Sequence, residues 1–211
     1  MREFFAAMAM ALALASGVAL ILDAKAAQAA AISLKTHTSL RHYVVSGADE
    51  LSLLREMRRK GPRVGGKPAL ASTRMQTRYT ARMRERGAAC RVEALQMEVR
   101  FIVTLPALHS GGSIRRTTRR RWPSFVRKLR RHENRHIAIW MDCLRQVKRT
   151  LPTLRAADCR RLRKRMRNTY QRIMRQCSRR HDAFDRREKH AAASLPFIKA
   201  AFGLAHGRAA R

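Results

Sequence analysis

The 211-residue sequence predicts an α+β fold: a small antiparallel sheet with one short helix, followed by two long helices. Short β-type segments and one helical segment share the region 40–104, whereas the pattern from Thr117 onward is helical. Leu151-Pro152 divides the helical part in two, because a residue that precedes proline disfavours helix. We therefore expect a signal peptide over 1–29, one domain over 30–195 and a basic C-terminal tail over 196–211.

Two strands and a helix are predicted in the first part of the domain. Tyr43-Val44-Val45 is a short aromatic and β-branched run, and Val92–Leu105 alternates in part between apolar and polar residues, so both predict strands. Ala48–Arg59 has a helical pattern, and Gly61-Pro62 and Gly65-Gly66 mark the loop that follows it.

Apolar residues recur at steps of three and four on both long helices, which predicts one buried face on each. The first stripe, on a helix expected to end near Thr150, consists of Trp122, Phe125, Val126, Leu129, Ile137, Trp140, Leu144 and Val147. The second stripe consists of Leu162, Met166, Tyr170, Ile173 and Phe184.

The chain is strongly basic. It contains 47 Lys and Arg, 38 of them Arg, against 14 Asp and Glu, for a net charge of +33. This charge excludes an ordinary acidic enzyme surface and favours anionic partners such as an envelope polymer, although an arginine-rich genome explains it equally well. Specific nucleic-acid binding is not expected, because no nucleic-acid fold signature occurs and aromatic residues make up only 6%.

The N-terminus has the pattern of a secretory signal peptide. An apolar run over 4–22 is followed by Ala27-Gln28-Ala29, a small-residue cleavage site. An uncleaved membrane anchor is the alternative, because the run is just long enough to span a bilayer. Cleavage after Ala29 predicts a secreted or periplasmic protein without a membrane span. Its four cysteines, which allow three pairings, can then form disulfide bonds.

The first long helix contains His132-Glu133-Asn134-Arg135-His136, an H-E-x-x-H motif. Residues four apart lie on one helix face, so both imidazoles can reach one ion, with Glu133 on a neighbouring edge. The two histidines continue the apolar stripe between Leu129 and Trp140, so this face is the buried one. Zinc takes neutral imidazoles, a third protein ligand and a water, and Glu133 can serve as general base for that water. The motif predicts zinc-dependent hydrolysis of peptide bonds.

Three other interpretations remain open. The histidines can be core residues bonded to backbone or water, but that leaves a buried glutamate beside them unexplained. The protein can also be a non-catalytic, strongly basic binder of envelope polyanions, for which the net charge would release counterions. A degenerate, metal-free protease relative is the third.

Further motifs are spread over 43–190. They are Tyr43-x-Val45-x-Gly47, the Gly61-Pro62 loop, a Cys90-x-Val92 strand leading to Leu105-Pro106, Trp122, the H-E-x-x-H motif, Cys159 and a terminal aromatic-Asp block at Phe184-Asp185. In these motifs the chain resembles the predicted secreted zinc-dependent proteases of bacteria, a family long catalogued as a domain of unknown function. The resemblance implies a zinc metallopeptidase that acts on peptides or proteins, with Glu133 catalytic and His132, His136 and His190 as Zn2+ ligands.

The terminal block departs from the family pattern, Tyr-Asp-x-x-Thr-x-His-Gly. Asp185 and His190 keep their places, whereas Phe184, Glu188 and Ala191 replace Tyr, Thr and Gly. The resemblance also implies a Cys90–Cys159 disulfide, whereas a hairpin turning at Pro152 sets Cys143 opposite Cys159.

The third ligand is open between His190 and, after it, Asp185, His181 and Glu188. If the chain turns back at Pro152, a straight second helix rising about 1.5 Å per residue places His181 roughly 20 Å beyond the metal. Binding by His190 then requires a break in that helix. We predict the break between Cys177 and Asp185, where Ser and Asp favour turns and like charges weaken the helix.

Overall fold

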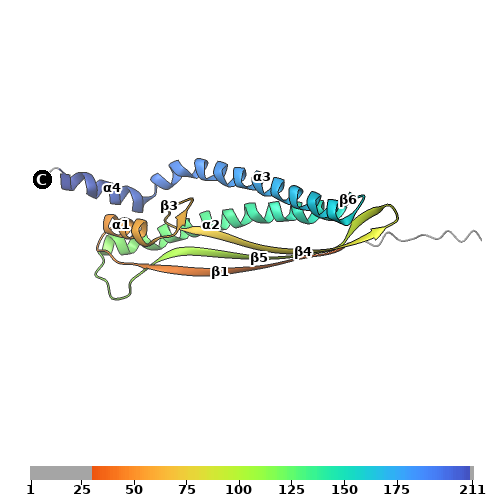
Figure 1. Ribbon diagram of the computed structural model, residues 1–211. Coiled ribbons are helices and arrows are strands. Elements are labelled where there is room, and N and C mark those ends of the chain that lie inside the picture. Colours follow the sequence, from red (N-terminus) through yellow and green to blue (C-terminus); the bar gives the residue numbers. More distant parts are fainter. Residues whose placement is uncertain (1–29, 210–211) are drawn as a thin grey trace, which may run out of the picture.

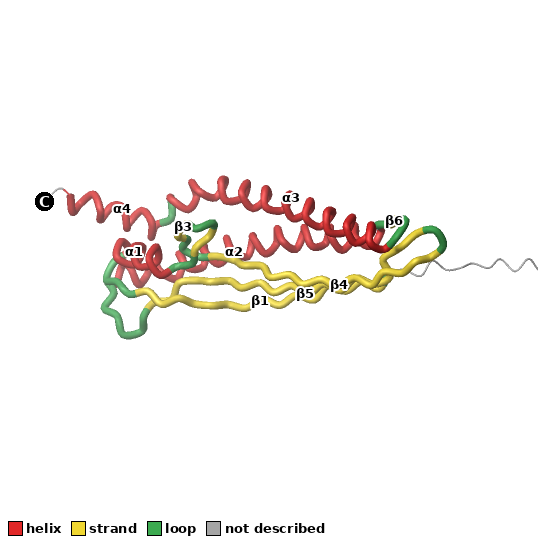
Figure 2. Tube along the Cα trace, viewed as in Figure 1, coloured by secondary structure: helices red, strands yellow, loops and turns green. Residues whose placement is uncertain are grey.

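The computed structural model describes residues 30–209, so the predicted signal peptide lies outside the described residues. Two long helices run side by side over one face of a long sheet (Figures 1 and 2). The strands are β1 (Ala31–Val45), β2 (Arg63–Val64), β3 (Lys67–Pro68), β4 (Ser72–Arg86), β5 (Ala89–Leu108) and β6 (Arg155–Ala156). The helices are α1 (Glu50–Lys60), α2 (Arg116–Thr150), the short 3-10 helix η1 (Leu151–Thr153), α3 (Cys159–Ala193) and α4 (Pro196–Ala209).

The main sheet has β5 at its centre. β4 pairs with it antiparallel through a hairpin at Gly87, whose φ of +59° favours glycine, and β1 pairs with it parallel. The α+β class is confirmed, but the sheet is larger than predicted and mixed instead of antiparallel. The parallel pair arises because the chain reverses twice between β1 and β5, once through α1 and once at the hairpin.

One face of the sheet forms the core with α2 and α3. Buried residues alternate along β5 with exposed ones, which is the pattern of a sheet covered on one side. The buried set is Leu95, Met97, Val99, Phe101, Val103 and Leu105. The covering side chains from the helices include Ile139, Leu144, Leu162, Met166 and Ile173.

Two disulfides fix this layer. Cys90 on β5 is bonded to Cys159 at the start of α3, which confirms the pairing implied by the family resemblance. Cys143 on α2 is bonded to Cys177 on α3, so the alternative pairing of Cys143 with Cys159 is wrong.

A second cluster closes one end of the sheet. There α1 and α4 pack against the start of α2, and the Phe125 and Phe197 rings stack at 4.3 Å. The segment 196–211 is expected to be a poorly patterned basic tail, but 196–209 form α4, and Phe197, Ile198 and Ala201 on it are buried. Among the described residues, no helix combines the length and apolar character needed to cross a membrane.

Candidate metal centre

The two motif histidines come together on α2. His132 and His136 are one helical turn apart, and their Nε2 atoms lie 3.1 Å from each other. Both rings are partly buried beneath α3, with side-chain exposures of 26% and 14%. Burial lowers the pKa of His136. The neutral imidazole that a metal ligand needs is thereby favoured.

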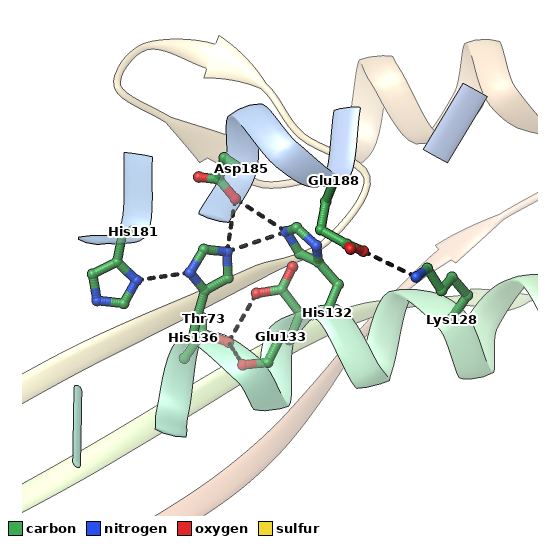
Figure 3. Close-up of polar contacts among 8 residues, drawn as sticks. All are labelled: Thr73, Lys128, His132, Glu133, His136, His181, Asp185 and Glu188. Carbon is green, nitrogen blue, oxygen red and sulfur yellow. Dashed lines mark hydrogen bonds and ion pairs between the residues drawn. The ribbon is translucent and has the colours of Figure 1, made fainter. Parts of the chain in front are cut away.

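Asp185 on α3 completes the group (Figure 3). Its Oδ1 lies 3.3 Å from Nε2 of His132 and 3.1 Å from Nε2 of His136. The three ligand atoms therefore form a nearly equilateral triangle. Ligands about 2.0 to 2.1 Å from one tetrahedral zinc ion lie about 3.3 Å apart, so two imidazoles and a carboxylate in this arrangement fit zinc.

Glu133 lies on the sheet side of the same helix turn. It is only 4% exposed, and the hydroxyl of Thr73 on β4 donates to its Oε2 at 2.8 Å. Burial raises the pKa of Glu133 to about 7, and the Asp185 charge adds to this while the Thr73 hydrogen bond opposes it. A carboxyl with this pKa can accept and release a proton near neutral pH.

Aromatic and charged residues surround the triangle. The Phe184 ring stacks on His132 at 4.8 Å and meets the His136 ring edge-on at 5.1 Å. Lys128 on α2 donates to Oε2 of Glu188 on α3 at 2.9 Å, which ties the two helices together beside the site.

His181 lies one turn before Asp185, on the same face of α3. Its Nδ1 is 2.7 Å from Nδ1 of His136, and its ring lies 4.3 Å from that of Trp140. Burial lowers the pKa of His181 to about 4, and the neighbouring His136 contributes to this shift.

Comparison with known proteins identifies the family. Residues 40–191, more than half of the chain, match the family described as bacterial protein of unknown function (DUF922). The chain belongs to this family. The matched segment contains all of α2 and its motif, as well as α3 through Asp185 and His190. Searches among curated proteins and among solved structures found no match.

The family description confirms a bacterial domain of unknown function and assigns it no activity. Two predictions about the site are not met: α3 has no break, and His190 does not join the histidine pair.

The predicted helix break is wrong, because α3 is continuous from Cys159 to Ala193. Its buried stripe continues through Cys177 and Phe184, which favours helix across the segment. Arg180 in the same segment donates to Asp142 of α2 at 2.8 Å, which offsets the repulsion among like charges.

His190 is consequently exposed and lies outside the ligand group, five residues beyond Asp185 on the same helix. The structure brings His132 and His136 together with Asp185 and not with His190. Of the other two candidates, His181 contacts His136 through its Nδ1, and Glu188 is paired with Lys128.

The predicted helix break and the predicted contact of His190 both depend on a turn of the chain at Pro152. The chain does not reverse there, because η1 and β6 carry it past the end of α2 before α3 begins at Cys159. The helices are paired with Cys143 opposite Cys177, so His136 lies beside His181 and Asp185.

Sequence reasoning missed two neighbours of the site. Thr73 lies on a strand that the pattern analysis did not find, and no local signal links it to Glu133. His181 was considered only as a ligand. His181 and Asp185 are four residues apart, as His132 and His136 are, so each pair lies on one face of its helix. This shared spacing indicates that the two faces can meet at one site.

Proposed function

We propose that the protein is a secreted or periplasmic zinc metallopeptidase that hydrolyses peptide bonds, with Glu133 as general base. The observation that supports this most directly is the triangle of His132 Nε2, His136 Nε2 and Asp185 Oδ1, with separations of 3.1 to 3.3 Å. In this proposal Asp185 takes the ligand position that the resemblance gives to His190.

A zinc ion bound there would supply a Lewis acid that lowers the pKa of a water molecule and polarises a peptide carbonyl. Transfer of the proton from the water would then depend on protein side chains. The Thr73 hydroxyl holds Oε2 of Glu133, which leaves Oε1 to accept a proton. Burial raises the pKa of this carboxyl to about 7, close to neutral pH, where proton transfer in both directions is efficient.

The export part of the proposal rests on the cysteines. All four are bonded in two disulfides, and no free cysteine occurs in the described part of the chain. Disulfides of this kind persist in oxidising compartments such as the periplasm and the extracellular space. The signal-like N-terminal sequence supports the same location.

The test uses protein recovered after export, with its disulfides intact. Metal analysis should give one zinc per chain, and mass spectrometry of an unfolded protein substrate should show cleavage that a chelator abolishes. Glu133→Gln should keep the zinc and lose about 100- to 10,000-fold in hydrolysis, because it removes a base and not a ligand. Glu98→Gln, which changes an exposed carboxyl on β5, is the matched control and should keep both properties.

Absence of zinc from the wild-type protein would contradict the proposal. Loss of zinc in Glu133→Gln would instead mean that Glu133 is a ligand or a structural residue.

A further inference from the structure

The two ring nitrogens of His136 face different groups. Nε2 lies in the ligand triangle, 3.1 Å from both His132 Nε2 and Asp185 Oδ1. Nδ1 points to the other side and lies 2.7 Å from Nδ1 of His181 (Figure 3). A separation of 2.7 Å between two ring nitrogens requires one proton between them, because two lone pairs or two N–H groups would repel each other.

The ligand role of His136 decides where that proton lies. A nitrogen that binds a metal gives up its lone pair, so a neutral His136 bound through Nε2 must have its proton on Nδ1. Nδ1–H of His136 then donates to His181, and the accepting Nδ1 of His181 is unprotonated. His181 in turn has its own proton on Nε2.

His181 is itself held in place. Its ring lies against Trp140 at a centroid distance of 4.3 Å, and it stands four residues before Asp185 on α3. The same face of α3 thus provides a ligand for the metal and an acceptor for the neighbouring ligand. Cys177, whose disulfide with Cys143 joins α3 to α2, lies one turn before His181.

His132 differs from His136 in this respect. Among the described residues, Nδ1 of His132 has no hydrogen-bond partner, and its ring is oriented by stacking on Phe184 with an interplanar angle of 30°. Only His136 therefore has a protein group that selects its tautomer.

We propose that His181 is a positioning residue for the metal centre, which accepts the Nδ1 proton of His136 and so keeps Nε2 of His136 free to bind zinc. The inference rests on the proposed zinc site. In other proteins, a hydrogen-bond acceptor outside the ligand group orients each metal-binding histidine, and this acceptor is usually a carboxylate or a carbonyl. Here the imidazole of His181 would take that place.

The test compares two substitutions at one position. His181→Phe keeps a ring beside Trp140 but has no acceptor, and it should weaken zinc binding about 10- to 100-fold, as loss of an outer hydrogen-bond partner does. His181→Asn places its amide oxygen close to the former Nδ1 and should restore affinity to within a few fold of wild type. Affinity is measured by competition with a chromogenic zinc chelator, using zinc alone and no substrate.

His190→Phe, an equivalent change at an exposed position of the same helix, is the matched control and should leave affinity unchanged. Circular dichroism identifies any variant that fails to fold. Nitrogen-15 NMR of the zinc-loaded imidazoles adds a second readout, and it should show the Nδ1–H form of His136 in wild type and in His181→Asn.

The outcomes separate the two hypotheses. A wild-type protein that binds no zinc would contradict the proposed function itself. If wild type binds zinc and folded His181→Phe binds it equally well, the positioning role is wrong. If folded His181→Phe and His181→Asn are equally weak, the imidazole acts through something other than this hydrogen bond, and the proposal is also wrong.

Discussion

Thr73 and Glu133 are 60 residues apart in the chain, and the Thr73 hydroxyl donates to the buried Glu133 carboxylate at 2.8 Å. This bond joins β4 to the turn of α2 that contains the two motif histidines. It stabilises the charged form of the carboxylate, whereas burial disfavours that form and raises the pKa of Glu133 to about 7. The protonation state of the proposed base thus depends on a strand outside the candidate ligand group.

Thr73→Val should raise the pKa of Glu133 further, because it removes the hydroxyl that opposes the effect of burial. The acid limb of the pH profile of kcat/KM should move to higher pH, since a base must be deprotonated to act. Thr73→Ser keeps a hydroxyl and should leave the limb close to its wild-type position. An unchanged limb in Thr73→Val would show that Glu133 is not the group that titrates.

Glu133 should also make the metal-free protein less stable as pH rises. Its pKa is about 7 in the folded protein against an ordinary value of 4.5, so between these values the folded state binds more protons than the unfolded state. The free energy of unfolding therefore falls as pH rises through this range and levels off above it. The contribution is about 3 kcal/mol, from roughly 1.4 kcal/mol per pKa unit.

Urea unfolding of chelator-treated wild type and Glu133→Gln between pH 4.5 and 8 measures this contribution. The difference between the two proteins isolates Glu133, because His181, with its pKa lowered to about 4, gives an opposite slope in both. A difference that does not vary with pH would contradict the prediction.

The sequence predicted α2 and the place of its motif because both depend on local spacing. Apolar steps of three and four define the buried face, and the histidines lie on it. The strand β4 was not predicted because its inner face is only partly buried and includes the polar residues Thr73 and Thr77, which weakens the apolar half of its alternation with exposed arginines. Most of β1 was not predicted. Beyond Leu34, the side chains on the face towards the helices are exposed, so they need not be apolar and give no alternating pattern.

The residue of α3 that completes the candidate ligand group could not be predicted from local pattern. Which residue of α3 meets His136 depends on how far the chain runs past the end of α2 before it reverses, and that path is fixed by η1, by the pairing of β6 with β5 and by the Cys90–Cys159 bond. A shift of a few residues in this connection exchanges one candidate ligand for another.

Asp185→Ala should weaken zinc binding by at least about 100-fold, the upper end of the effect of losing an outer partner. His190→Ala should have no effect, because the side chain is exposed and lies outside the ligand group. Competition with a zinc chelator measures both. If His190→Ala weakens zinc binding and Asp185→Ala does not, the third ligand is His190 and not Asp185.

The two disulfides should differ in their effect on the metal. Replacing either pair with serine should cost about 4 kcal/mol of stability by the loop-entropy relation. Only loss of Cys143–Cys177 should also weaken zinc binding, because this bond joins the two helices that hold the proposed ligands, whereas Cys90–Cys159 ties α3 to the sheet at the far end. Equal zinc affinities in the two double variants at a temperature where both are folded would contradict this prediction.

The exported protein should begin at Ala30 or within a residue or two of it, as mass spectrometry of the intact chain can show. Thiol titration should find no free cysteine before reduction and four after it. A chain that begins at Met1 with four free thiols would rule out export.

The two edges of the sheet also differ in how they are protected. The edge strand β4 has six charged residues and a bulge between Arg82 and Met83, whereas β1 pairs with β5 in unbroken register and has only Lys35 and Arg41. Charges and bulges keep edge strands from joining those of other molecules, so β1 is the less protected edge. Separate copies are then kept apart mainly by mutual repulsion between chains of net charge +33. Salt screens such repulsion over about 10 Å at 0.1 M, so the protein should be most resistant to aggregation in dilute buffer and should associate through β1 as the ionic strength is raised.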